Sequence, residues 1–129
     1  MKLEFIDLES GDARKVSTIM PQAVNTNINL INAEVSNDML NLSFEFTALY
    51  TPDGSYIRMH GKAKFSGKEV KKAYEEWGKT QTITGETGEY ILNSINYTST
   101  VNSVFLARVF GLTPPVTLPV LKFELQKKK

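Results

Sequence analysis

The side chains of this sequence that could take part in catalysis or metal binding are few. His60 is the only histidine, and the chain contains no cysteine. Because Arg58 and Lys62 flank His60 at two-residue spacing, their charges disfavour both a protonated imidazole and a bound cation. We therefore interpret His60 as a surface residue, and we expect neither an enzyme nor a bound metal or cofactor.

A second candidate for chemistry is the short segment Gly85-Glu86-Thr87-Gly88. It contains two glycines but lacks the lysine and the spacing of a phosphate-binding loop, so it is better interpreted as the lead-in to a helix. The acidic residues show no paired spacing typical of a general acid and base. A formal net charge of +1 gives no overall field that would attract nucleic acid or an acidic membrane, so we expect neither as a partner.

Length and composition predict one folded domain spanning residues 1–129. Hydrophobic residues make up 41% of the chain and charged residues 22%, which is close to the average of globular proteins. The absence of cysteine fits a reducing compartment. Met1 to Phe5 has no apolar core of a signal peptide, and no run of about 20 apolar residues occurs. We therefore expect a cytoplasmic protein.

Alternating polarity predicts antiparallel strands in the first half of the chain. Apolar and polar residues alternate from Met39 to Tyr50 and again from Tyr56 to Phe65, with a Pro-Asp-Gly turn between the two segments. We expect these segments to pair as a hairpin with one buried face. Upstream, the parity of the apolar positions changes between Leu30 and Ile31, which indicates a β-bulge.

The first strand is expected to be bent, because its apolar positions also change parity, from Leu3 and Phe5 to Ile6 and Leu8. A polar loop is predicted to follow it, from Ser10 to Ser17.

The period of the apolar residues becomes helical after Phe65. Ser66 and Glu69 have the spacing of a capping box, and a short amphipathic helix is predicted to end at Gly78. A longer helix is expected from near Thr87 to Gly111. The predicted fold class is therefore α+β, with a four-stranded antiparallel sheet followed by a short and a long helix.

The long helix carries no charged residue from Tyr90 to Ala107, whereas a helix that faces solvent normally shows a charged stripe. We interpret one of its faces as core and the opposite face as a contact with another subunit; a helix buried within its own domain is the alternative. The predicted core face consists of Leu92, Ile95, Leu106 and Val109. The predicted oligomer interface consists of Tyr90, Tyr97, Val101 and Val104.

The end of the chain is apolar and rich in proline, which prevents it from continuing the helix. The helix end Leu106-Ala107-Arg108-Val109-Phe110-Gly111 precedes Pro114-Pro115-Val116-Thr117-Leu118-Pro119-Val120-Leu121-Lys122-Phe123. This sequence is similar to the "glycine, Phe-Pro, apolar, Leu, Pro, apolar, Phe" segment of SecB proteins. With the order of four strands, short helix and long helix, the chain resembles the SecB protein-export chaperone family over nearly its whole length.

The resemblance implies an ATP-independent holdase that binds unfolded or non-native polypeptides in apolar grooves of a homo-oligomer, a tetramer built as a dimer of dimers. By position, it implies substrate contacts at Ile19, Met20, Val24, Ile28, Leu112, Val116, Leu118 and Val120. The family uses an acidic sheet face and a zinc-binding tail to dock on the SecA motor. Because this chain has Arg58, Lys62 and Lys64 on that face and no cysteine, we expect a general or partner-dedicated holdase instead of an export factor.

Two other functions stay open at this point. One is a small-molecule or lipid carrier with an apolar cavity between the sheet and the helices. The other is binding of single-stranded nucleic acid by the basic side chains of Arg58, Lys62 and Lys64, with Tyr56 as a stacking platform. Strands with polar outer faces are common, so this second alternative is the weaker one.

Overall fold

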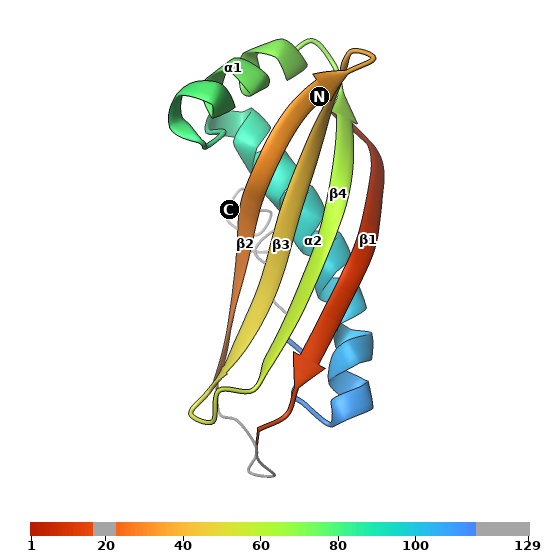
Figure 1. Cartoon of the computed structure of the whole chain (residues 1–129), viewed down its shortest axis with the longest axis vertical. Coiled ribbons are helices and arrows are strands. Elements are labelled where there is room, and N and C mark those ends of the chain that lie inside the picture. The colour runs from red at the N-terminus through yellow and green to blue at the C-terminus, as the bar shows by residue number, and fades with distance from the viewer. Residues whose placement is uncertain (17–22, 116–129) are drawn as a thin grey trace, which may run out of the picture.

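The computed structural model describes residues 1–16 and 23–115, which form a four-stranded sheet and two helices (Figure 1). The elements are β1 (Lys2–Arg14), β2 (Ala23–Ser36), β3 (Met39–Thr51), β4 (Tyr56–Ser66), α1 (Val70–Thr80) and α2 (Gly85–Phe110). All neighbouring strands are antiparallel, and their order in the sheet is β1-β4-β3-β2. The predicted α+β fold, with a short helix followed by a long one, is confirmed.

Both helices lie on the same face of the sheet, which we call the inner face. Figure 1 shows α2 crossing behind the sheet obliquely, from the β2 side near α1 to the β1 side at the other end, and α2 packs mainly against β1 and β4. The opposite face, which we call the outer face, carries no helix of the described residues. Across the described part of the chain, neither helix combines the length and apolar character needed to cross a membrane.

β3 and β4 pair as a hairpin, as predicted, and form the centre of the sheet. On β3 every second side chain from Leu40 to Tyr50 is buried, and on β4 Ile57, Ala63 and Phe65 are fully buried. Gly61 interrupts the row on β4 because a Cβ there would lie 2.8 Å from the ring of Phe44 and 2.5 Å from a backbone oxygen of β1. The glycine therefore makes room for an aromatic ring at the middle of the core.

The predicted irregularities of the outer strands are confirmed. The pairing of β2 with β3 shifts between Leu30 and Asn32, and the pairing of β1 with β4 shifts between Leu3 and Phe5. A second shift in β1, between Leu8 and Ser10, was not predicted. Each shift inserts a residue that bends and twists the strand.

The predicted polar loop from Ser10 to Ser17 is wrong, because β1 continues to Arg14. Past the second shift the polar side chains of Asp12 and Arg14 lie on the outer face, while the small side chain of Ala13 packs inward against the core. The inward positions of this part of the strand are Gly11 and Ala13, which give little alternation signal, so the sequence resembles a loop.

The predicted ends of α1 are also wrong. Glu69 is the N-cap residue, but its side chain makes no capping hydrogen bond; the hydroxyl of Ser66 donates to Glu4 of β1 instead. At the other end the helix passes Gly78 and ends at Thr80, where Gln81 adopts a left-handed conformation with φ of 62°. A glycine inside a helix costs only about 1 kcal/mol relative to alanine, which does not by itself end a helix.

The core face of α2 differs from the predicted one. The buried side chains are small or medium-sized and recur every fourth position: Ile91, Ile95, Ser99, Ser103 and Ala107. Of the four residues predicted, Ile95 is buried and Leu106 is half-buried, but Leu92 and Val109 are exposed. Because the aromatic side chains of β3 and β4 already fill the inner face, small residues let the helix axis approach the sheet closely.

Candidate functional site

The most distinctive surface of the molecule is a row of apolar side chains on the side of α2 that faces away from the sheet. We call Tyr97, Val101, Phe105 and Val109 the outer stripe. They recur every fourth residue and are 73%, 44%, 63% and 74% exposed. At 1.5 Å per residue the stripe is about 18 Å long. A helix face that stays in solvent normally carries charged residues. An exposed row of apolar side chains therefore more often marks a contact surface.

Three of the four residues predicted for the oligomer interface lie on or beside this stripe. Tyr97 and Val101 belong to it, and Val104 is half-buried next to it. Phe105 was missed, and Val109 was assigned to the core. The spacing of four from Tyr97 onward is the signal that finds both residues.

Tyr90, the fourth predicted interface residue, contacts its own sheet. Its hydroxyl accepts a hydrogen bond from the backbone N–H of Leu3 at 3.0 Å, and its ring meets Phe65 edge-on with centroids 6.1 Å apart. Tyr90 therefore anchors the first turns of α2 to β1 and β4, while leaving part of its ring exposed.

Only some of the predicted substrate contacts lie within the described residues. Val24 and Ile28 are half-buried on the inner face of β2, at the border of the core, which is consistent with a partly open apolar surface. Leu112 is not on an open surface: it is 5% exposed and belongs to the core cluster of Tyr50 and Phe46, so this prediction is corrected. Ile19, Met20, Val116, Leu118 and Val120 lie outside the described residues.

The chain that follows α2 is held against the end of β3. Gly111 adopts a left-handed conformation with φ of 70°, and the N–H of Leu112 donates to the carbonyl of Ala107 at 2.8 Å. The hydroxyl of Tyr50 then donates to the carbonyl of Thr113. Because Val24 is the cross-strand partner of Tyr50, these contacts bring the segment after α2 close to the start of β2.

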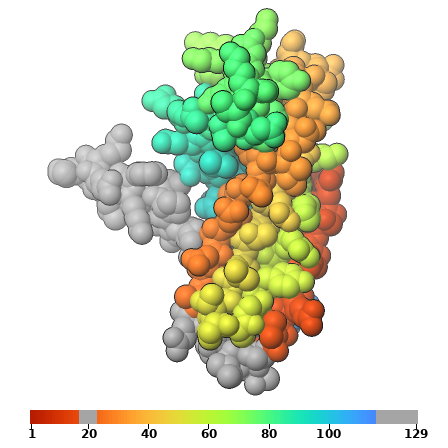
Figure 2. Space-filling model, turned by 60° about the vertical axis from the view of Figure 1, so that its left-hand side comes forward, coloured from red at the N-terminus to blue at the C-terminus, as the bar shows by residue number. Residues whose placement is uncertain are grey.

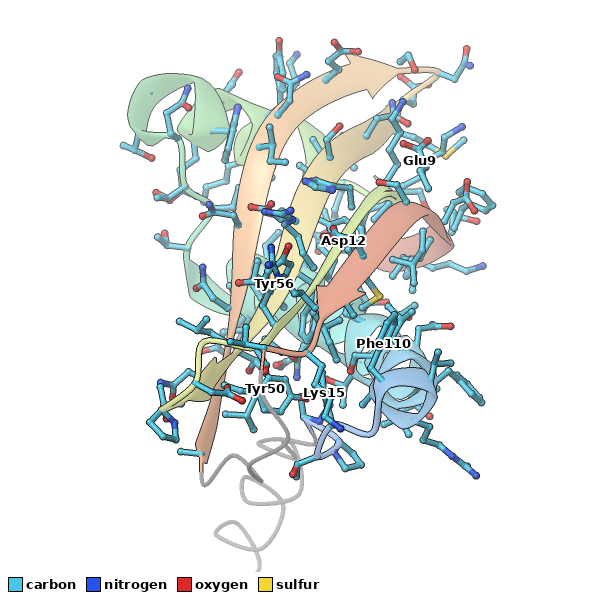
Figure 3. The ribbon with its side chains drawn as sticks, turned by 60° about the horizontal axis from the view of Figure 1, so that its bottom comes forward. Glu9, Asp12, Lys15, Tyr50, Tyr56 and Phe110 are labelled. Carbon is cyan, nitrogen blue, oxygen red and sulfur yellow. The ribbon has the colours of Figure 1, made fainter. Side chains whose placement is uncertain are left out.

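Two cations of the outer face, Arg58 and Lys62, lie beside carboxylates of the same molecule. Arg58 forms an ion pair with Asp12 at 3.2 Å, and its guanidinium lies over the ring of Tyr56. The hydrogen bond and charge of Asp12 raise the pKa of Arg58 above its ordinary value. Figure 3 shows Glu9, Asp12 and Tyr56 on this face.

The two lysines of the same face also have neighbours. Lys62 lies 3.8 Å from Glu9, and the ammonium of Lys64 lies 6.0 Å from the ring centre of Phe5. Arg58 and Lys62 thus lie beside carboxylates, which reduces the charge that this face offers to a phosphate backbone, whereas the ring of Phe5 neutralises no charge. The geometry therefore weakens the nucleic-acid alternative.

His60 has a partner that its neighbours along the strand did not predict. Glu45 lies opposite it on β3, and its carboxylate oxygen is 3.1 Å from Nε2 of His60. The prediction considered only the flanking cations and missed Glu45. The residues next to His60 in the sequence do not indicate which residue lies opposite it on the neighbouring strand. Among the residues that the structure describes, no three histidine, aspartate or glutamate side chains are grouped to hold a metal ion.

The described residues form an α+β domain with an antiparallel sheet and two helices on its inner face. The longer helix, α2, carries the exposed outer stripe. Comparisons with models of known families, with curated proteins and with solved structures find no match.

Proposed function

We propose that this protein is an ATP-independent holdase, similar in arrangement to SecB chaperones. It assembles as a homo-oligomer, a tetramer in our proposal, and binds unfolded or non-native polypeptides in the cytoplasm. The observation that carries the proposal is the outer stripe of α2. Burying a valine or phenylalanine side chain contributes about 1.5–3 kcal/mol, so covering the stripe provides a substantial driving force for association.

The two apolar surfaces suit different tasks. The outer stripe is straight and regular, which favours packing against the same stripe of a second copy across a two-fold axis. The inner face of β2 is instead a border region where Val24, Ile28 and Leu30 are half-buried. Such a border accepts apolar side chains of varied sequence, so we assign client binding to it and assembly to the stripe.

A holdase of this design needs no fuel. Each apolar contact with a client is weak, but several contacts spread over one oligomer add up through high local concentration. A client that folds buries its own apolar side chains and thereby releases itself. Fast-folding proteins escape capture for the same reason.

A small-molecule or lipid carrier is the second candidate. It requires a cavity between the sheet and α2, yet Phe44, Phe46 and Phe65 are fully buried there together with Ile91 and Ile95 of the helix. This filled core favours the chaperone. Native mass spectrometry separates the two functions: an oligomer free of small ligands supports the chaperone, and a monomer that retains a small apolar ligand supports the carrier.

The direct test is suppression of client aggregation. A chemically denatured protein is diluted into buffer with stoichiometric amounts of this protein, and light scattering is followed with and without ATP. We expect suppression that does not depend on ATP. Phe105→Lys is expected to weaken it by separating the copies, whereas Glu89→Lys, a change of charge at an exposed position of the same helix, leaves it intact. Aggregation that proceeds unchanged with the wild-type protein contradicts the proposal.

A further inference from the structure

The sheet has two edge strands, β1 and β2, and they differ in how well they are protected. An edge strand presents unpaired backbone N–H and C=O groups that can pair with another chain. Bulges, charged side chains and covering elements are the usual means of blocking such pairing.

The edge of β1 carries all three kinds of protection. Its pairing is interrupted by two register shifts, and charged side chains are frequent along it, including Lys2, Asp7 and Asp12. In addition, the N–H of Leu3 is bonded to the hydroxyl of Tyr90, and α2 packs against this strand more than against any other. A further strand finds little regular backbone to pair with here.

Among the described residues, the first part of the β2 edge has neither charges nor a register shift, although α1 packs against this strand. No charged residue occurs from Ala23 to Ala33, and its register is regular as far as Leu30. Figure 2 looks toward this side of the molecule and shows β2, in orange, at the surface along much of its length. Within residues 1–16 and 23–115, β2 is by the usual criteria the edge that is more open to pairing.

Hydrogen bonds at the β3–β4 turn show which residues of β2 have backbone N–H and C=O groups that point to the free edge. The N–H of Tyr50 donates to Ser55 at 2.8 Å, and the carbonyl of Tyr50 accepts from Gly54 at 3.0 Å, so both groups point toward β4. Val24 is opposite Tyr50. Their pair is therefore a non-hydrogen-bonded one, and the N–H and C=O of Val24 point to the free edge.

The same alternation assigns the outward backbone groups to Val24, Thr26, Ile28 and Leu30. The side chains of these four residues are half-buried and lie on the inner face of the sheet. The side chains of Asn25, Asn27 and Asn29 are exposed and lie on the outer face. Open backbone groups and partly open apolar side chains thus lie along one line. The β1 edge gives an independent check, because Leu3, whose N–H also leaves the sheet, has an inward side chain too.

We propose that the free edge of β2, from Val24 to Leu30, binds an extended segment of the client polypeptide as an antiparallel fifth strand. This inference rests on the proposed holdase function and names the kind of segment bound. The segment is uncharged and alternates apolar and polar residues, with its apolar side chains beside Val24, Ile28 and Leu30. Backbone pairing supplies affinity that is independent of sequence, as a holdase needs.

An unfolded client fits this edge better than a second copy of the chain. Its backbone groups and its apolar side chains are all available, so it can pair with β2 and cover Val24 and Ile28 at once. A folded copy would bring an edge whose inner side is already partly covered by its own core. Antiparallel pairing is assigned because it is slightly more stable per residue than parallel pairing.

Peptides with methylated backbone nitrogens test the pairing and its register. The parent peptide alternates valine and threonine between terminal lysines, and its binding to the full-length protein is measured by fluorescence anisotropy. In an antiparallel fifth strand the valines lie opposite the β2 residues whose backbone groups point to the free edge, so the N–H groups of the valines bond to β2. N-methylation of the valines should therefore weaken binding at least about ten-fold. N-methylation of the threonines, on the far edge, should change it by less than about two-fold. Equal binding of both methylated peptides, or selective loss with methylated threonines, overturns the inference.

Two matched proline variants test the edge from the protein side. Thr26→Pro removes an outward N–H in the middle of the β2 edge, and Ala13→Pro places the same change on β1; both positions tolerate proline better than a central strand does. Circular dichroism verifies that each variant is folded. We expect Thr26→Pro to weaken binding of the parent peptide about ten-fold and Ala13→Pro to leave it unchanged. Equal weakening by both, or no weakening by Thr26→Pro, contradicts the inference.

Two further measurements distinguish pairing with a client from pairing with a second copy, and edge pairing from the holdase function itself. Thr26→Pro should leave the oligomeric mass unchanged; a smaller mass would show that β2 pairs with a second copy and would overturn the client assignment. Wild-type protein that suppresses aggregation but binds both methylated peptides equally keeps the holdase function and refutes edge pairing. Wild-type protein that fails to suppress aggregation refutes the holdase function itself, and with it the assignment of a client to the edge.

Discussion

The hydroxyl of Tyr50 donates a hydrogen bond to the backbone carbonyl of Thr113, which fastens the segment after α2 to the end of β3. The side chain of Tyr50 is fully buried and Thr113 is exposed, so this bond lies at the border between core and surface. Together with the burial of Leu112 in the core, it holds the chain that leaves α2 next to the start of β2.

Removal of this hydroxyl tests the contact. Tyr50→Phe keeps the ring in the core and deletes the donor, so we expect the free energy of unfolding to fall by about 1 kcal/mol. Urea denaturation followed by circular dichroism measures the change. Tyr56→Phe on the outer face is the control and should have little effect; equal losses in the two variants would contradict the role given to Tyr50.

Alkaline pH should destabilise the protein through the same residue. Burial raises the pKa of Tyr50 to about 12. The unfolded chain therefore loses this proton at a lower pH, near 10, than the folded protein does, so stability is full below pH 10 and declines as the pH rises toward 12. The unfolding free energies of wild type and Tyr50→Phe, compared across this range, should converge. A difference that stays constant with pH would refute the assignment.

Acidic pH should act on the junction of the two helices. The carboxylate of Glu76 in α1 accepts hydrogen bonds from the N–H of Thr84 at 3.1 Å and from its hydroxyl at 2.6 Å, and Thr84 is the N-cap residue of α2. These bonds lower the pKa of Glu76. Their stabilisation is present above the ordinary glutamate pKa of about 4.3 and is lost as the pH falls through that value and below.

Glu76→Gln is the matching variant. It should be less stable than wild type at neutral pH, and the difference should disappear under acidic conditions, where the wild-type carboxyl is protonated. Thermal unfolding at a series of pH values measures both. Identical pH profiles of the two proteins would show that Glu76 does not hold the junction through its charge.

Two serines on the inner face of α2 should respond oppositely to alanine substitution. The hydroxyl of Ser99 is buried and has no hydrogen-bond partner in the described part of the chain, whereas that of Ser103 donates to the carbonyl of Thr100 at 2.8 Å. A buried unpaired polar group costs about 1–3 kcal/mol, so Ser99→Ala should be neutral or stabilising. Ser103→Ala should lose stability. Denaturant unfolding compares them, and a larger loss for Ser99→Ala would disprove the burial argument.

How much of the structure could be predicted depended on the size of the side chains involved. The β3 and β4 hairpin was found because large apolar residues alternate strictly from Leu40 onward, and such a pattern fits only a sheet with one buried face. The β-bulge at Leu30 was found for the same reason. The inner face of α2 was mispredicted because Ser99, Ser103 and Ala107 are small and partly polar, and their burial depends on aromatic rings of another element.

The candidate surfaces show the same division. The absence of charge between Tyr90 and Ala107 identified the outer stripe of α2 in part, and the spacing of Tyr97 and Val101 placed two of its members. Leu112 was misassigned because apolar character does not distinguish a core residue from a binding residue. The free edge of β2 could not be predicted, since strand order and register arise only when the sheet is assembled.

The solution mass of the protein, measured by light scattering over a range of concentrations, tests the central claim most directly. If the outer stripe of α2 packs against a second copy, wild type has a mass that is a multiple of 14.5 kDa, four-fold in our proposal. Phe105→Lys, which places a charge in the middle of the stripe, should lower that mass, while Glu89→Lys should not. A wild-type protein that stays at 14.5 kDa at every concentration contradicts the account.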